Sequence, residues 1–161
     1  RSVRWSARNG VIEIRAPRHA RPADLERIAE DIIARVLKQR ARARRRQDVD
    51  LQERARLINR RYFDGELSWH TIRWADNMER RLGSCTTGGS TDGDIRISAR
   101  IRAWPQYVVD YVIAHELAHR RHPDHSPAFW AMLARYPHVE RARGFIEGIA
   151  FAENADADAL L

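Results

Sequence analysis

The stretch Tyr111-Val-Ile-Ala-His-Glu-Leu-Ala-His-Arg-Arg-His-Pro-Asp-His-Ser126 decides the fold of this chain, and it contains the pattern HExxH. Positions four apart on a helix lie one turn above each other, so the side chains of His115 and His119 can point at one metal ion. Glu116 lies about 100° further around the helix, where it can accept a proton from water at the metal without being a ligand. The pattern predicts a zinc site of the kind that hydrolases use.

The third ligand must come from outside this pair, because a catalytic zinc ion usually has three protein ligands and one position for water. Pro123 favours a break in the helix, after which the chain can turn back toward the metal. His125 follows His119 by six residues, the spacing found in a longer zinc motif, and it is our first choice. His122 is an alternative on the same helix face. Asp124 is a further one, better suited to holding a histidine ring by a hydrogen bond.

The simplest alternative to a metal site is a helix with solvated histidines, because HExxH by itself is a weak signal. Four of the seven histidines in the chain, however, fall between residues 115 and 125, and a helix breaker stands among them. This clustering favours metal binding, and Zn2+ is therefore the expected cofactor.

The composition is typical of a soluble globular protein, with 43% hydrophobic and 32% charged residues in a chain of 161. We find no apolar run long enough to cross a bilayer and no signal peptide, so no membrane association and a cytoplasmic location are expected. Cys85 is the only cysteine in the sequence, which excludes an internal disulfide and fits a reducing compartment. A thiolate can bind zinc, but we favour a small buried residue in a turn.

The net charge of +7 is concentrated in the first part of the chain. Residues 1–64 carry eighteen basic and nine acidic side chains, whereas residues 65–161 carry eleven and thirteen. The densest basic run, which includes Arg40 and Arg46, suggests contact with phosphate groups in a nucleic acid or an anionic ligand. A solvated, arginine-rich helix end is the alternative.

The first part of the chain predicts a hairpin followed by two helices. Two alternating segments, residues 3–7 and 11–15, flank Asn9-Gly10, a strong signal for a β-hairpin turn. Apolar residues recur with helical period from Leu25 to Leu37 and predict an amphipathic helix that runs into the basic run. A second helix is expected from about residue 49 to 63, where Asp64-Gly65 ends it.

The middle of the chain predicts three strands, at residues 69–74, 80–86 and 94–101. The third strand alternates isoleucine with arginine or serine, which predicts one buried and one cationic face. Its edge is a candidate for pairing with an extended peptide, and an ordinary sheet strand is the alternative.

The HExxH helix is expected to start near Pro105 and to face the core through Val109, Ile113 and Leu117. Ser126-Pro127 then predicts the start of another helix. Its aromatic and aliphatic residues are expected to be core: Phe129, Trp130, Leu133 and Tyr136. A last helix from about residue 139 to 151 leads to an acidic tail, residues 153–158, that is expected to be frayed.

Several of these stretches together resemble a known family. Arg81-Leu-Gly-Ser-Cys85, Ile95-Arg-Ile-Ser98 and the stretch from Tyr107 to Trp130 resemble the YgjP-like metallopeptidase family. Residues 59–67 are similar instead to the beginning of SprT-like domains, a sister group that includes DNA-associated proteases.

The resemblance implies an α+β, small single-domain zincin-like fold. His115, His119 and His125 would be its zinc ligands and Glu116 its general base. Because no linker divides the chain, one domain over residues 1–161 is expected, with residues 1–46 as a basic hairpin-helix arm and residues 47–152 as the catalytic core.

The predicted reaction is zinc-dependent hydrolysis of a peptide or protein, in which Glu116 passes a proton from water to the leaving amine. A second group must stabilise the oxyanion, and Tyr111, Tyr136, His122 and Arg100 are candidates that the sequence does not rank. Two alternatives stay open. The resemblance also suggests a nucleoside triphosphate pyrophosphohydrolase acting on UTP, and a structural zinc could serve a non-catalytic DNA-binding module.

Overall fold

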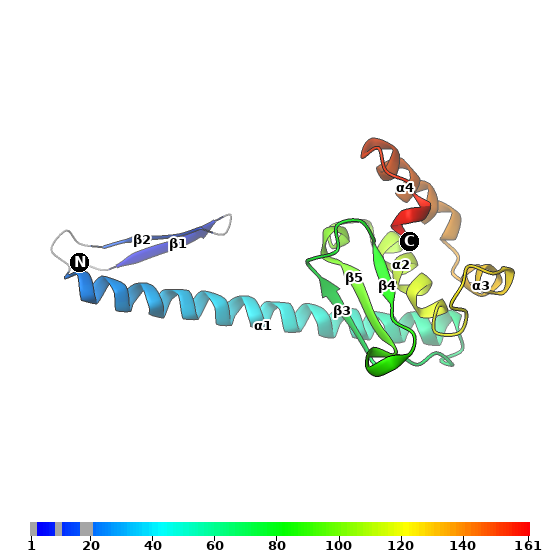
Figure 1. Cartoon of the computed structure of the whole chain (residues 1–161), viewed down its shortest axis with the longest axis horizontal. Coiled ribbons are helices and arrows are strands. Elements are labelled where there is room, and N and C mark those ends of the chain that lie inside the picture. Colours follow the sequence, from blue (N-terminus) through cyan, green and yellow to red (C-terminus); the bar gives the residue numbers. More distant parts are fainter. Residues whose placement is uncertain (1–2, 9–10, 17–20) are drawn as a thin grey trace. The chain divides into compact units, whose positions relative to one another are not determined.

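The computed structural model describes residues 3–8, 11–16 and 21–161, and it shows the predicted α+β architecture (Figure 1). The chain divides into two compact units, Arg1–Arg46 and Gln47–Leu161. The boundary after Arg46 coincides with the one expected between the basic arm and the catalytic core. The assignment of the two units to these roles stays a prediction.

The first unit begins with a hairpin of two antiparallel strands, β1 (Arg4–Arg8) and β2 (Val11–Arg15). Arg4 pairs with Arg15 and Arg8 pairs with Val11, so the strands are in register along their whole length. The predicted hairpin is confirmed, although its Asn9-Gly10 turn lies outside the described residues.

The longest helix, α1 (Pro22–Tyr62), is continuous over 41 residues. The prediction of two separate helices in this region is therefore wrong. The basic run between them contains no glycine or proline, and its arginine, alanine and glutamine residues all favour helix, so nothing interrupts the backbone. The helix ends where predicted: Asp64 and Gly65 adopt positive φ angles, and the amide of Gly65 donates to the carbonyl of Asn59.

The second unit contains a three-stranded sheet, as predicted, formed by β3 (Thr71–Ala75), β4 (Gly83–Cys85) and β5 (Asp94–Ser98). The strand order is β3-β5-β4, with β3 parallel and β4 antiparallel to β5. Because β5 is hydrogen-bonded on both sides, its edge cannot take up an extended peptide, and that prediction is wrong. The strand beside β5 that lies at the sheet edge and near the histidines is β4.

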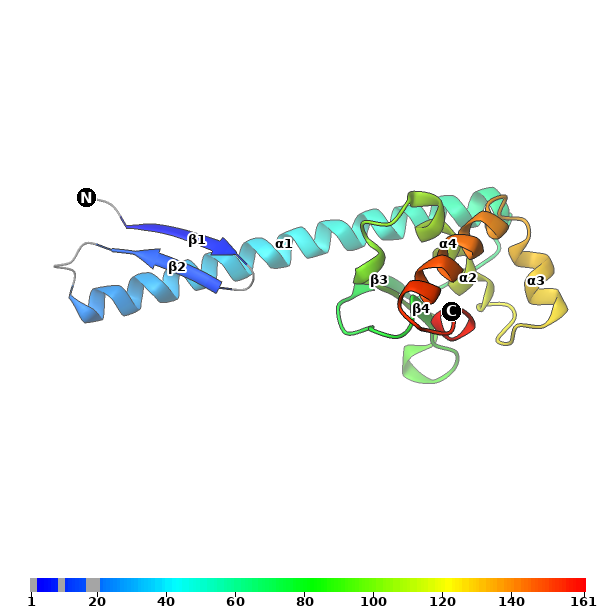
Figure 2. The same ribbon diagram turned by 90° about the horizontal axis from the view of Figure 1, so that it is seen from above.

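The HExxH segment lies on α2 (Gln106–Ala118), which is the centre of this unit. It contacts β4 and β5 as well as two later helices, α3 (Pro127–Leu133) and α4 (Val139–Ala152) (Figures 1 and 2). Val109, Ile113 and Leu117 are buried as predicted, and so is every other residue from Val108 to Ala118. A helix that is buried on all sides consists mostly of apolar residues. Each polar side chain on it costs free energy unless it has a bonding partner or a functional role.

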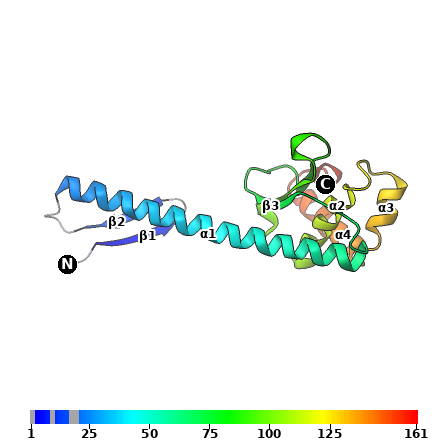
Figure 3. The same cartoon turned by 90° about the horizontal axis from the view of Figure 1, so that it is seen from below.

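The C-terminal part of α1, from Asp48 onward, holds α2 and β3 in place (Figure 3). Arg54 forms two charge-assisted hydrogen bonds with the buried carboxylate of Asp110 on α2, one of them 2.7 Å from Nε to Oδ1. Gln106 donates to the same carboxylate at 2.9 Å, and Asp48 accepts from the backbone amide of Trp74 on β3 at 3.0 Å. The burial of Asp110 is thus compensated by a cation and an amide.

The two C-terminal helices start and stop close to the predicted positions. Ser126 caps α3 by accepting from the amide of Phe129, and Pro127 is its first residue. The acidic tail is not frayed as expected. Residues after α4 fold back into a short 3-10 helix, η3 (Asp158–Leu160), whose Leu160 is only 4% exposed and joins the hydrophobic core.

No helix within the described ranges has the combination of length and apolar character that a membrane span requires.

Candidate metal centre

Three histidine side chains converge on one point at the C-terminal end of α2. The Nε2 atom of His115 lies 3.1 Å from that of His119 and 3.1 Å from that of His125. His115 comes from the last turn of α2 and His119 caps it, while His125 follows the turn that contains Pro123. Sequence spacing therefore selected three residues that the fold brings together.

The geometry fits a metal ion held by three imidazoles. In a tetrahedral zinc site with Zn–N distances of about 2.0–2.1 Å, neighbouring nitrogens are separated by about 3.3 Å. The Nδ1 atom of His119 lies 3.0 Å from the carbonyl oxygen of His122, so it carries the proton and leaves Nε2 with a lone pair. That lone pair is directed toward the other two rings, as a metal ligand requires.

His115 and His119 are held in the neutral form that binds metal. Burial, and then the charges of His119 and His125, lower the pKa of His115 well below its usual value. Burial also lowers the pKa of His119. Metal therefore competes with few protons for these rings at neutral pH.

Glu116 lies beside the cluster and is 1% exposed, against strand β4. In the metal-free protein, burial raises the pKa of this carboxyl group to about 8, and the charge of Arg81 opposes the rise. A bound dication would lower it again. Its Oε1 atom is buried without a hydrogen-bond partner among the described residues, as expected for a group that awaits water or substrate.

Gly83 on β4 makes room for this carboxylate, a role that the sequence analysis missed. A Cβ atom placed on Gly83 would lie 2.3 Å from Oε1 of Glu116, which is far inside van der Waals contact. A glycine inside a strand is a known signal for close approach by another group, so the residue could have been singled out.

Two cavities open onto the histidine cluster. One of about 330 Å³ is lined by Glu116, His119 and His125, together with Arg81 and the residues of β4. The other, of about 570 Å³, is lined by His115, His125, Trp130 and Arg143.

Trp130 was expected in the core, and this expectation is wrong. Its side chain is 37% exposed and stacks on the ring of His125 with centroids 5.6 Å apart, while Phe129, Leu133 and Tyr136 are buried as predicted. The reason is helical geometry: Trp130 lies about 100° around α3 from Phe129, which turns it toward the cavity.

Among the residues predicted to assist the reaction, Tyr111 contacts the ring of His115, with centroids 6.2 Å apart, whereas the others interact elsewhere. The hydroxyl of Tyr136 donates to the carbonyl of Tyr107 at 2.9 Å, and Tyr111 is fully buried with a pKa raised to about 12 by burial. The side chain of His122 lines a different cavity, and it is its carbonyl group that orients His119. Asp124 was expected to hold a histidine ring by a hydrogen bond, but its side chain is exposed, and the His122 carbonyl group makes this bond instead.

Arg100 also bonds to groups away from the histidine cluster. It donates to the carbonyl of Glu79 at 2.9 Å and forms an ion pair with Glu153 at 3.5 Å. Arg81, which the sequence analysis did not consider, is the arginine that lines the cavity of Glu116.

Cys85 lines the same cavity but does not belong to the metal-ligand group found among the described residues. Its thiol is half-buried, and burial, followed by the charge of Glu116, raises its pKa. A protonated thiol is a poor metal ligand. The expectation of a buried residue in a turn is wrong, because Cys85 is half-buried and lies in β4, and its role stays a prediction.

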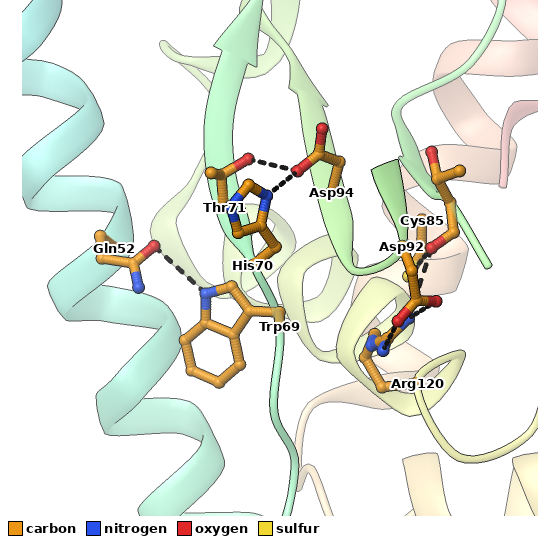
Figure 4. A network of polar contacts seen from close by, with 9 residues as sticks. Gln52, Trp69, His70, Thr71, Cys85, Asp92, Asp94 and Arg120 are labelled. Carbon is orange, nitrogen blue, oxygen red and sulfur yellow. Dashed lines mark hydrogen bonds and ion pairs between the residues drawn. The ribbon is translucent and has the colours of Figure 1, made fainter. Parts of the chain in front are cut away.

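Arg120, next to His119, ties the loop between β4 and β5 to the end of α2 (Figure 4). It donates to Asp92 at 2.9 and 3.1 Å and to the carbonyl of Ser68 at 2.9 Å. The hydrogen bonds from Arg120, and then from the amide of Gly88, lower the pKa of Asp92 to about 2. His70 and Thr71 contact Asp94 at the start of β5, each at 2.9 Å.

Residues 66–144 match the family model described as YgjP-like, metallopeptidase domain. The match begins just before β3, includes α2 and the whole histidine cluster, and ends within α4. Over this stretch the chain is similar to the YgjP-like metallopeptidase domain. The family predicted from the quoted motifs is thereby confirmed, and this YgjP-like domain contains Glu116 and all three converging histidines.

Among solved structures, the crystal structure of the metallopeptidase zymogen of Pyrococcus abyssi abylysin is similar to this chain. The TM-score is 0.48 at 20% identity, over 66% of this chain and 95% of that chain. A search among curated proteins finds no significant match.

The match to a metallopeptidase model implies a metal ion and suggests a peptide or protein substrate. The nucleic-acid contact predicted near Arg40 and Arg46 lies outside the YgjP-like domain, and no observation on the described residues supports it. It stays a prediction, as do the SprT-like features, the UTP-type reaction and the structural-zinc alternative.

Proposed function

We propose that this protein is a zinc-dependent peptidase whose ion is held by His115, His119 and His125, with Glu116 as the general base. The observation that carries the proposal is the convergence of three imidazole nitrogens beside a buried carboxylate. Three neutral nitrogen ligands with room for a fourth group are typical of catalytic rather than structural zinc sites. The matching YgjP-like domain supports the peptidase assignment.

The histidines hold and orient the ion. His119 is fixed in one tautomer by the His122 carbonyl, and the stacked ring of Trp130 restrains His125. When bound, zinc supplies a Lewis acid that lowers the pKa of water and polarises a peptide carbonyl. The adjoining cavity, bounded by β4, gives that carbonyl a place to lie.

Glu116 moves the proton. Its carboxylate accepts a proton from the attacking water and returns it to the amine that leaves when the peptide bond breaks. Gly83 sets the position of the carboxylate, and burial makes it a stronger base than an exposed glutamate. Arg81, on the wall of the same cavity, is our candidate for stabilising the oxyanion.

The test is the substitution Glu116→Gln, which keeps the shape of the side chain but removes the base. We expect metal content to stay at one ion per chain and turnover of casein or a fluorogenic peptide to fall by about 10²–10⁴-fold. The exposed Glu147→Gln is the matched control and should keep full activity. Full activity in Glu116→Gln would refute the mechanism.

The same purified protein should be offered UTP. Release of pyrophosphate without any peptide cleavage would replace the peptidase proposal with the nucleotide alternative. A metal-loaded protein that turns over neither substrate, yet binds DNA with an affinity that falls steeply with salt, would favour the structural-zinc module.

A further inference from the structure

The segment after α4, residues 157–161, returns to the metal centre. In Figures 1 and 2 the end of the chain lies beside β4 and α2. Its anchor is the side chain of Leu160, which is 4% exposed and belongs to the core of the second unit. The buried leucine anchors this segment to the core, whereas residues 153–156 before it are exposed.

The backbone of this segment is bound to the start of the edge strand. The amide of Leu82 donates to the carbonyl of Leu160 at 2.7 Å, one residue before β4 begins. The carbonyl of Leu82 accepts from Ser98 of β5 at 2.8 Å. Leu160 therefore satisfies a buried amide at the point where the ladder between β4 and β5 ends.

The same segment borders both cavities that reach the histidines. Asp158 and Leu161 line the cavity of Glu116 and also the cavity of Trp130 and Arg143. In the second cavity, Asp158 brings a carboxylate to the space that also contains the guanidinium of Arg143. The segment thus places backbone, apolar and acidic groups where an incoming polypeptide would have to lie.

We propose that residues 157–161 form an inhibitory strap, which occupies part of the substrate-binding space and must be displaced before a polypeptide reaches the metal centre. This inference rests on the proposed peptidase function. An extended substrate binds a sheet edge through main-chain hydrogen bonds and side-chain pockets, and the strap already uses one such bond and one such pocket. Its apolar contacts come from Leu160 and the partly buried Ala157 and Leu161, and a segment this short can be displaced reversibly.

The experiment cuts the strap in the folded, full-length protein. A recognition sequence for a site-specific protease is inserted between Ala155 and Asp156, in the exposed part of the tail, and a scrambled insert that cannot be cut is the control. Binding of two metal-directed probes is measured before and after cutting: acetohydroxamate, which is small, and a tripeptide hydroxamate, which must extend along β4.

Cutting should raise the affinity for the tripeptide hydroxamate by about ten- to a hundredfold, the range expected for freeing one leucine pocket. The affinity for acetohydroxamate and the metal content should not change. Hydrogen exchange at the amide of Leu82 should accelerate, because its acceptor leaves. Leu160→Ala should reproduce the gain in part, whereas the exposed Leu57→Ala should not.

The two proposals fail in different ways. Unchanged binding of the tripeptide probe, with metal present and acetohydroxamate bound, would overturn the strap and leave the peptidase proposal intact. A protein that binds neither metal nor acetohydroxamate would overturn the proposed function, and the strap with it.

Discussion

At the scale of single residues, the candidate metal centre depends on a glycine, Gly83, which has no side chain. Gly83 allows the carboxylate of Glu116 to lie directly against β4, where it is shielded from water. Shielding raises the pKa of the carboxyl group, and the contact also limits where its oxygens can go. The basicity and the position of Glu116 thus both depend on one glycine.

The substitution Gly83→Ala should therefore impair the reaction more than the fold. The new methyl group would overlap Glu116, which must move, and misplacement of a base by about 1 Å can cost about 10²-fold in rate. Metal content should be unchanged, since no ligand is touched. Steady-state turnover and metal analysis check both statements.

Gly148→Ala is the matched control for this substitution, because a Cβ atom there meets nothing within 4 Å. It lies in α4, so it should stabilise the protein by up to about 1 kcal/mol and leave turnover unchanged. Equal rates for Gly83→Ala and the wild type would show that Glu116 does not need this position.

At the scale of secondary structure, α2 is positioned through a charge. Its buried Asp110 is bound by Arg54 of α1 and by Gln106 one turn earlier. The hydrogen bond with Asp110 raises the pKa of Arg54, so this cation stays charged. Removing one member of such a pair leaves an uncompensated charge in the interior.

Arg54→Ala should destabilise the second unit by about 2–3 kcal/mol, below the range for a fully buried pair because Arg54 itself is partly exposed. Urea denaturation measures the change. The exposed neighbour Arg56 provides the control, and Arg56→Ala should stay within about 0.5 kcal/mol of the wild type. A similar loss in both variants would contradict a specific role for the pair.

At the scale of the whole molecule, a metal ion would join parts of the chain that secondary structure leaves separate. His115 and His119 belong to the end of α2, whereas His125 lies in the turn before α3. An ion bound to all three fixes that turn and with it the wall of the second cavity. Because the unfolded chain cannot hold the three rings together, binding also stabilises the fold.

Removal of metal by a chelator should lower the melting temperature by about 10 °C. Zinc present at about 100 times its Kd contributes about 2.7 kcal/mol, and each kcal/mol shifts a domain of this size by about 4 °C. Scanning calorimetry with and without chelator, followed by addition of zinc, gives the value. His125→Ala should lose most of the shift, whereas Glu116→Gln should keep it; an unchanged melting temperature would argue against a metal in the native protein.

The local chemistry of this protein was determined by sequence alone. Helical periodicity places His115 and His119 one turn apart, and the hairpin, the three strands and the capped α3 follow from patterns a few residues long. The absence of a helix breaker from residue 38 to 48 is also visible in the sequence, although the basic run suggested a boundary there.

Only the tertiary structure decided which groups surround the histidines. The pairing of β4 with β5 brings Gly83 to Glu116, and the return of the chain after α4 brings Leu160 to Leu82. These partners are tens of residues apart, and no local pattern encodes such distances. They are set by the burial of the whole core, which depends on all its side chains at once.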